Sequence, residues 1–148
     1  MSTLFKATPG VYVIMKKDDK ALFMHRLNTN YQLGKHMLPG GGIEQGEPPK
    51  QAGVREAAEE LAIDIAITDL KLAHIMYRPP HDETGERVDF FFVTTLWDKE
   101  PIINEPHKCD ELAWFSLNNL PESVPEYIRV AIAHWQHGVH YSEFGWDK

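Results

Sequence analysis

The sequence contains a single cysteine, no long apolar run and no excess of positive charge, and each absence excludes a class of protein. Cys109 alone cannot form an internal disulfide or a multi-cysteine metal site, so a reducing, cytoplasmic location is expected. No apolar run approaches the ~20 residues of a membrane-spanning helix, and the first residues do not have the layout of a signal peptide. The formal net charge of −7 disfavours binding to nucleic acid polymers or anionic membranes.

The chain also lacks internal repeats, low-complexity tracts and flexible linkers, which predicts one domain over residues 1–148. Branched and aromatic residues predict strands, and two segments have the apolar spacing of helices. Strands are expected over 11–15, 21–27, 70–78, 88–97 and 112–115, and helices over 48–62 and 124–138. Polar residues 28–36 are expected to form a loop, as are glycines 40–42. This order is typical of an α+β fold in which helices cover a mixed sheet.

The segment from Gly40 to Ile63 carries the strongest functional signal. In its predicted helix, apolar side chains at 54, 57, 58 and 61 share one face, and Glu56, Glu59 and Glu60 share the opposite face. Three carboxylates within one turn repel one another, and a cation must offset that repulsion unless the face is simply solvated. A divalent ion such as Mg²⁺ would do so, because hard cations prefer carboxylate oxygens.

The same segment resembles the Nudix box, whose pattern is G-x5-E-x7-R-E-U-x-E-E-x-G-U, with U a bulky aliphatic residue. Seven positions match at the fixed spacing: Gly41, Glu47, Arg55, Glu56, Glu59, Glu60 and Ile63. Two positions differ, since Ala57 replaces the first aliphatic residue and Ala62 replaces the closing glycine, which would normally supply a left-handed helix cap. The resemblance implies a Nudix-type α/β/α sandwich with a loop–helix–loop catalytic segment.

The resemblance also implies roles for the residues of the box. Glu56, Glu59, Glu60 and the carbonyl of Gly40 would hold Mg²⁺, for which Mn²⁺ can substitute. Glu59 would act as the general base, and Arg55 would orient the glutamates through charge-assisted hydrogen bonds. The metal would neutralise a pyrophosphate group and align the attacking water. Glu59, Arg55 and Glu56 are therefore the expected catalytic residues.

Residues outside the box complete the expected site. Arg26, at the end of the second predicted strand, is expected to face the phosphates of the substrate, with Arg78 and Lys35 as competitors for that role. Gly41 is expected to contact the substrate. Each of the three cations has the alternative of a solvated surface position.

The segment from Glu105 to Trp114 resembles a stretch of the MutT-homologue nucleotide diphosphatases. This resemblance offers Glu105 or Glu111 as an additional carboxylate near the metal. It favours hydrolysis of a nucleoside triphosphate, normal or modified, to a monophosphate and pyrophosphate. The expected partner is thus a small nucleotide, and a homodimer is left open.

Two alternatives remain at this point. The first is an ADP-ribose or nucleotide-sugar pyrophosphatase, since Pro79 lies 16 residues beyond the box, where ADP-ribose hydrolases of this superfamily tend to carry a proline. The second is a non-catalytic nucleotide-sensing module with a Nudix-like fold. Such modules commonly lose glutamates of the box, whereas this chain keeps them.

Overall fold

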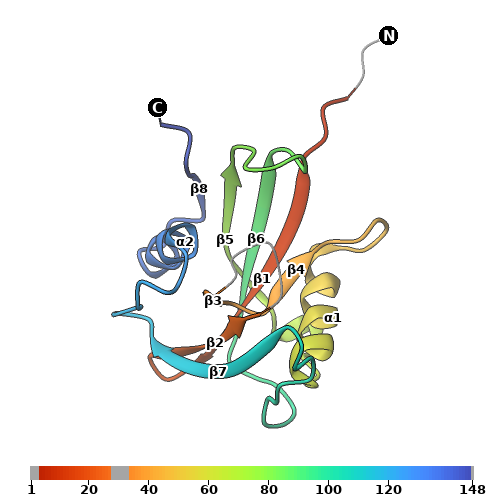
Figure 1. Cartoon of the computed structure of the whole chain (residues 1–148), viewed down its shortest axis with the longest axis vertical. Helices are drawn as coiled ribbons and strands as arrows, with labels where there is room; N and C mark the ends of the chain where they lie inside the picture. Colours follow the sequence, from red (N-terminus) through yellow and green to blue (C-terminus); the bar gives the residue numbers. More distant parts are fainter. Residues whose placement is uncertain (1–3, 28–33, 148) are drawn as a thin grey trace.

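A mixed β-sheet runs through the middle of the molecule, with one long helix on each side (Figure 1). This computed structural model describes residues 4–27 and 34–147. Within these ranges the strands are β1 (Thr8–Lys17), β2 (Lys20–Arg26), β3 (His36–Met37), β4 (Gly40–Gly42), β5 (Lys71–Arg78), β6 (Arg87–Thr94), β7 (Cys109–Ser116) and β8 (Tyr141–Glu143). The helices are α1 (Pro49–Leu61), α2 (Glu126–Gln136) and the short 3-10 helix η1 (Ile67–Asp69).

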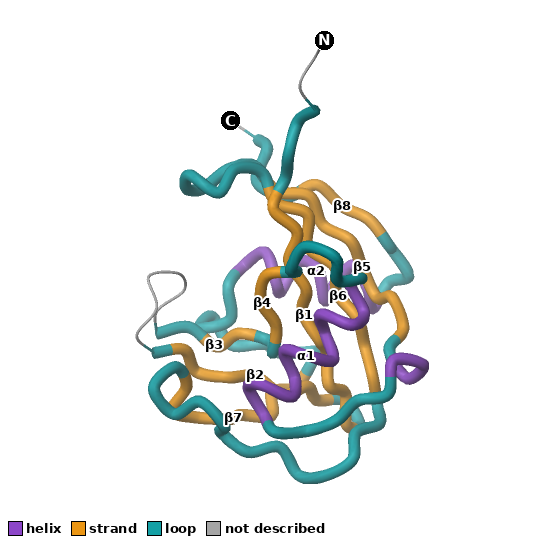
Figure 2. The backbone as a smooth tube through the Cα atoms, turned by 90° about the vertical axis from the view of Figure 1, so that its right-hand side faces the viewer, coloured by secondary structure: helices purple, strands orange, loops and turns teal. Residues whose placement is uncertain are grey.

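Strand β1 joins the two parts of the sheet. It pairs in parallel with β6 from Thr8 to Met15, and its last residues, Lys16 and Lys17, pair antiparallel with β2. The strand order is β3-β2-β1-β6-β5-β8, with β4 added on β1 and β7 added on β2. Figure 2 shows β2 and β7 side by side at one end of the molecule. The central position of β1 brings β4, and the segment that follows it, onto the middle of the sheet.

Alternate residues of β1 face opposite sides of the sheet and fill two separate cores. Val11 and Val13 pack in the same buried cluster as Leu61 of α1. Tyr12 and Ile14 point the other way and pack in a cluster that contains the buried residues of α2. The layers are therefore helix, sheet and helix, which confirms the predicted α/β/α sandwich.

Both long helices lie where the apolar spacing predicted them. Helix α1 begins after Pro48 and ends at Leu61, and its C-cap residue Ala62 adopts a left-handed conformation with φ 57° and ψ 39°. Ala62 thus takes the cap conformation that glycine would adopt at this position of the Nudix box. Helix α2 ends shortly before Gly138, whose φ of 75° explains why glycine stands there.

The structure differs from the predicted strands in three places. Glycines 40–42 form β4, which pairs antiparallel with residues 10–12 of β1, and are not a loop. His36 belongs to β3, while residues 28–33 of the predicted loop lie outside the described residues. Strand β8, which pairs with β5 at the edge of the sheet, was not predicted. Within the described ranges, no helix is both long and apolar enough to cross a membrane.

Candidate active site

The glycines of β4 allow helix α1 to approach the sheet closely. A Cβ atom on Gly40 would collide with the backbone carbonyl of Val11, and one on Gly41 would collide with the carboxylate of Glu56. Gly42, by contrast, has open space where a side chain would begin. The missing side chains at 40 and 41 therefore place the acidic side of α1 directly over the backbone of β4.

Glu60 is the most buried carboxylate of the box. Its Oε1 accepts a hydrogen bond from the backbone N–H of Gly40 at 2.9 Å, and its Oε2 accepts one from Nη1 of Arg26 at 3.2 Å. Burial, together with the negative charge of Glu56, raises the pKa of Glu60 to about 8, although Arg26 and the Gly40 N–H lower it. The expectation that Glu60 points away from the packed face of the helix was wrong. The buried residues of α1 are Ala52, Gly53, Ala57, Glu60 and Leu61.

Arg55 holds the other acidic groups of the box in place. Its Nε donates to Glu47 at 2.7 Å, and its Nη2 donates to the carbonyl of Gly42 at 2.9 Å. Its Nη1 donates to Glu56 and to Glu59, both at 3.2 Å. The hydrogen bond from Arg55 lowers the pKa of Glu47, and the carboxylates raise the pKa of Arg55 above its ordinary value. This one guanidinium therefore links β4, the loop before α1 and the acidic side of α1.

Glu56 and Glu105 lie close enough for their charges to interact. Burial raises the pKa of Glu56, Arg55 lowers it, and the charges of Glu59 and Glu105 raise it further. Glu105 is also within 3.7 Å of Lys108. Of the two carboxylates offered by the sequence outside the box, Glu105 is thus the one whose charge acts on a glutamate of the box.

The remaining sequence candidates lie elsewhere. Glu111, on β7, is 2.7 Å from Nε2 of His36 and is exposed to solvent. Arg78 is buried, with its Nε 2.6 Å from Asp89, so it is not a free cation for a phosphate. Lys35 is exposed. Of the three competing cations, Arg26 is therefore the one that contacts a glutamate of the box.

The acidic cluster has the chemistry of a site for a hard cation. Its donors are carboxylate oxygens, which hard cations prefer. Burial is the main cause of the raised pKa of Glu56, and the charges of Glu59 and Glu105 add to it. In the part of the chain that the structure describes, no three carboxylate, imidazole or thiolate side chains already converge on one point. The carboxylates are instead turned toward Arg55, Arg26 and the N–H of Gly40. The residues present therefore fit a divalent metal by charge and by donor type.

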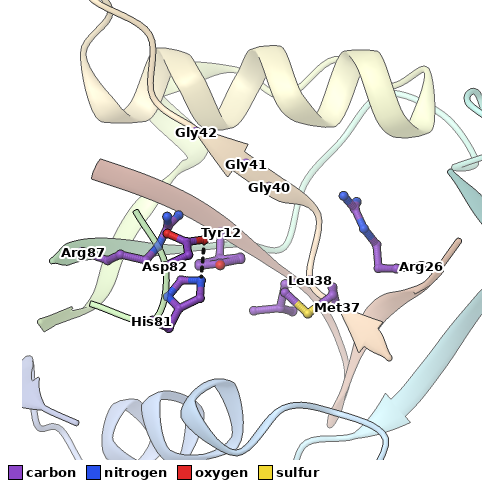
Figure 3. Close-up of a pocket in the computed structure, with 10 residues that line it drawn as sticks. All are labelled: Tyr12, Arg26, Met37, Leu38, Gly40, Gly41, Gly42, His81, Asp82 and Arg87. Carbon is purple, nitrogen blue, oxygen red and sulfur yellow. Dashed lines mark ion pairs between the residues drawn. The ribbon is translucent and has the colours of Figure 1, made fainter. Parts of the chain in front are cut away.

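A cavity of about 270 Å³ opens beside this cluster, on the face of the sheet that carries Tyr12 (Figure 3). Arg26 stands at one end of it, next to Glu60, and His81, Asp82 and Arg87 stand at the other. The lining residues are Tyr12, Arg26, Met37, Leu38, Gly40, Gly41, Gly42, His81, Asp82 and Arg87.

The group at the far end of the cavity was not predicted. His81 and Asp82 belong to a polar loop that reads as ordinary surface in the sequence, and Arg87 begins the strand after it. The parallel pairing of β1 with β6, which sets Thr8 opposite Arg87, brings this loop to the glycines of β4. The spacing of residues in the sequence does not predict that two distant strands pair.

Comparison with known proteins identifies the family. Residues 6–135 match the model described as the NUDIX domain, so the chain belongs to the Nudix family. It is a Nudix hydrolase, an enzyme that hydrolyses acid anhydrides. Members of this family generally use divalent metal ions and act on small nucleotide substrates. The alternative of a non-catalytic sensing module is therefore not supported.

Two relatives of known activity differ in their substrates. The chain is 30% identical over 134 residues to an ADP-ribose pyrophosphatase of Methanocaldococcus jannaschii, covering 88% of this chain and 76% of the relative. It is 25% identical over 119 residues to an 8-oxo-dGTP diphosphatase of Escherichia coli, covering 74% of this chain and 81% of the relative.

Solved structures have the same fold. The MutT NUDIX hydrolase of Burkholderia pseudomallei superposes with a TM-score of 0.77 at 25% identity, covering 87% of this chain and 98% of the other. A MutT protein of Methanosarcina mazei gives the same TM-score at 21% identity, covering 92% of this chain and 98% of the other. The second similarity concerns the fold alone.

Proposed function

We propose that this enzyme hydrolyses a nucleoside triphosphate, normal or modified, between its α and β phosphates, and that it does so with Mg²⁺. The observation that carries the proposal is the contact between Arg26 and Glu60 at one end of the cavity. A cation and an acidic cluster meet there, so one part of the site suits phosphate oxygens and the other suits a metal. The cavity beside them leaves room for the nucleoside.

The metal would be held by Glu56, Glu59, Glu60 and the carbonyl of Gly40, with Glu105 as the additional carboxylate. When bound, it would neutralise negative charge on the phosphates and make the phosphorus more open to attack by water. Mn²⁺ is expected to substitute for Mg²⁺, because both take oxygen ligands.

The protein groups have separate tasks in this proposal. Arg26 binds phosphate oxygens and fixes the chain of phosphates along the cavity, with the backbone of Gly41 beside it. Arg55 keeps Glu56 and Glu59 in position through its two 3.2 Å hydrogen bonds. Glu59 is half exposed and therefore accessible to water. Its carboxylate accepts a proton as the water oxygen bonds to the α phosphorus and the bond to the leaving pyrophosphate breaks.

Hydrolysis of a deoxynucleoside triphosphate in ¹⁸O-water tests this assignment. Nucleoside monophosphate and pyrophosphate are expected as first products, with the ¹⁸O label in the monophosphate because the water attacks the α phosphorus. Glu59→Gln should lose most of the activity, whereas Glu100→Gln, the same change at an exposed position, should keep it. Orthophosphate and nucleoside diphosphate as first products would contradict the proposal.

An ADP-ribose or nucleotide-sugar pyrophosphatase is the second candidate. The M. jannaschii relative with that activity matches this chain over 134 residues, and Pro79 stands at the end of β5, where it packs near Gly145. Comparison of kcat/KM for ADP-ribose, a nucleotide sugar and the deoxynucleoside triphosphates decides between the two. A higher value for ADP-ribose would favour this second candidate.

Location and assembly complete the proposal. We expect the enzyme in the cytoplasm, where Cys109, buried at the start of β7, stays reduced. A homodimer is the assembly to test, by sedimentation at several protein concentrations. Cell fractionation tests the location.

A further inference from the structure

The far end of the cavity carries a pair of opposite charges that the proposed reaction does not use. Arg87 and Asp82 lie there side by side, beyond Tyr12 and away from Arg26 (Figure 3). Between the two ends the wall is formed by the buried side chains of Tyr12, Met37 and Leu38. An apolar wall with hydrogen-bonding groups at its end suits a flat heterocycle whose polar edge points to that end.

We propose that Arg87 and Asp82 read the base of the nucleotide and select a 6-oxopurine over a 6-aminopurine. This inference rests on the proposed function in so far as a nucleotide occupies the cavity with its phosphates at Arg26. It adds which base the site takes and which residues decide it.

Arg87 lies beside Gly10, and its Nη1 is 3.5 Å from Oγ1 of Thr84. A Cβ atom on Gly10 would lie 2.9 Å from Oδ1 of Asp89 and 3.5 Å from Nη2 of Arg87. The missing side chain of Gly10 therefore leaves space beside its backbone for both the guanidinium of Arg87 and the carboxylate of Asp89. Asp89 is fully buried, and its Oδ1 has no hydrogen-bond partner within the described part of the chain. Asp89 is paired with Arg78 through its Oδ2, and its Oδ1, which has no hydrogen-bond partner among those residues, favours a cation such as Arg87 at this end of the cavity.

Asp82 is held as an ionised acceptor. Its Oδ1 accepts a hydrogen bond from the backbone N–H of Thr84 at 2.8 Å, and its Oδ2 lies 3.3 Å from Nε2 of His81. Hydrogen bonds from Thr84 lower the pKa of Asp82, so the carboxylate accepts hydrogen bonds and donates none. The turn at 82–84 fixes Oδ1, so a hydrogen bond from a ligand would be accepted by Oδ2, beside Nε2 of His81.

This order of donor and acceptor matches one kind of purine edge. The guanidinium of arginine offers two parallel N–H groups, which fit the O6 and N7 acceptors of a 6-oxopurine. The next group along that edge is N1–H, a donor that an ionised aspartate can accept. A 6-aminopurine has an amino group at position 6 and a lone pair at N1, so it would place donor against donor and acceptor against acceptor.

The test uses two substrates that differ in this edge alone, inosine triphosphate and adenosine triphosphate. For the wild type we expect kcat/KM to be at least about tenfold higher for inosine triphosphate than for adenosine triphosphate. One good bidentate contact provides discrimination of this size. Arg87→Lys keeps the charge but loses the two-pronged donor, and Asp82→Asn keeps the shape but loses the acceptor charge. Each variant should lower kcat/KM for inosine triphosphate. The ratio of kcat/KM for inosine triphosphate to kcat/KM for adenosine triphosphate should therefore come close to one.

Glu83→Gln is the matched control, because Glu83 is an exposed carboxylate in the same loop and does not line the cavity. It should keep the wild-type ratio. Binding of inosine and adenosine monophosphates, measured by calorimetry, separates base reading from catalysis. The inosine compound should bind more tightly to the wild type, and this preference should disappear in Arg87→Lys.

Equal kcat/KM for the two triphosphates, or a preference for the adenosine compound, would overturn the inference while leaving triphosphate hydrolysis intact. If neither triphosphate is hydrolysed but inosine monophosphate binds preferentially and through Arg87, base reading stands and the proposed reaction fails. If the two monophosphates also bind equally, the inference is overturned as well.

Discussion

Arg26 donates a hydrogen bond from its Nη1 to Oε2 of Glu60 across 3.2 Å, and so joins the end of β2 to the last turn of α1. The two residues are 34 positions apart in the chain. Glu60 is only 5% exposed, yet Arg26 does not hold its pKa at the ordinary value, because burial and the charge of Glu56 outweigh the guanidinium. The contact therefore couples the protonation of a buried acid to the phosphate end of the cavity.

The first prediction concerns the stability of the metal-free enzyme as the pH changes. The pKa of Glu60 is about 8 in the folded protein, above the 4.5 of an unperturbed glutamate. Between these values the folded state binds more protons than the unfolded state, so this residue's contribution to stability is lost as the pH rises through 8. In the presence of chelator, the melting temperature of the wild type should fall between pH 5.5 and pH 8.5 more steeply than that of Glu60→Gln. Parallel curves for the two proteins would contradict a raised pKa at Glu60.

The second prediction concerns Glu56 as a metal ligand. Glutamine at this position keeps the shape of the side chain but removes the charge, so Mn²⁺ or Mg²⁺ should no longer raise the melting temperature as it does in the wild type. The value of kcat/KM should fall more than about tenfold, which corresponds to at least ~1.4 kcal/mol of barrier. Glu100→Gln, at an exposed position, provides the control. A Glu56→Gln enzyme that keeps more than a tenth of the activity would remove Glu56 from the principal ligands.

The sequence predicted those parts of the site that depend on local spacing. The apolar repeat located α1, and the box placed Arg55 four residues before Glu59, where the structure finds a 3.2 Å ion pair. Helical periodicity could not predict that Glu60 is buried, because that burial depends on Gly40 of β4 and Arg26 of β2. Three consecutive glycines have no strand propensity, and β4 forms because β1 offers it a partner.

The residues at the far end of the cavity were even harder to predict from the sequence. Asp82 and Arg87 come together with Tyr12 through a parallel pairing between strands more than 70 residues apart. A pattern within one segment carries no information about such a pairing. Residues fixed by the box were therefore predictable, and residues fixed by strand order were not.

The third prediction concerns the cap of α1. Ala62 occupies a left-handed conformation with φ 57°, which costs an alanine roughly 1 kcal/mol and a glycine almost nothing. Ala62→Gly should therefore raise the free energy of unfolding by up to about 1 kcal/mol, measured with urea. Ala58→Gly, inside the same helix, should lower it by roughly 1 kcal/mol. A loss of stability in Ala62→Gly as large as that in Ala58→Gly would show that the cap conformation is not strained.

The last prediction uses the three glycines of β4, which meet different neighbours although they are adjacent in the chain. Alanine at Gly40 would meet the backbone carbonyl of Val11, which cannot move without breaking the pairing of β1 with β4. Gly40→Ala should therefore lose stability by about 1–3 kcal/mol, as in other overpacked sites. Alanine at Gly42 would enter open space and should change neither stability nor activity.

Gly41→Ala is the informative member of the series. Its new methyl group would meet the carboxylate of Glu56, the mobile end of a side chain, which can swing away at little cost to the fold. We therefore expect melting and urea midpoints close to those of Gly42→Ala but a kcat/KM at least about tenfold lower, a loss of ~1.4 kcal/mol in the barrier alone. The apparent affinity for Mn²⁺ should fall with it, because the displaced carboxylate is a proposed ligand. If Gly41→Ala instead keeps both activity and metal affinity, the position of Glu56 over β4 is not what the reaction requires.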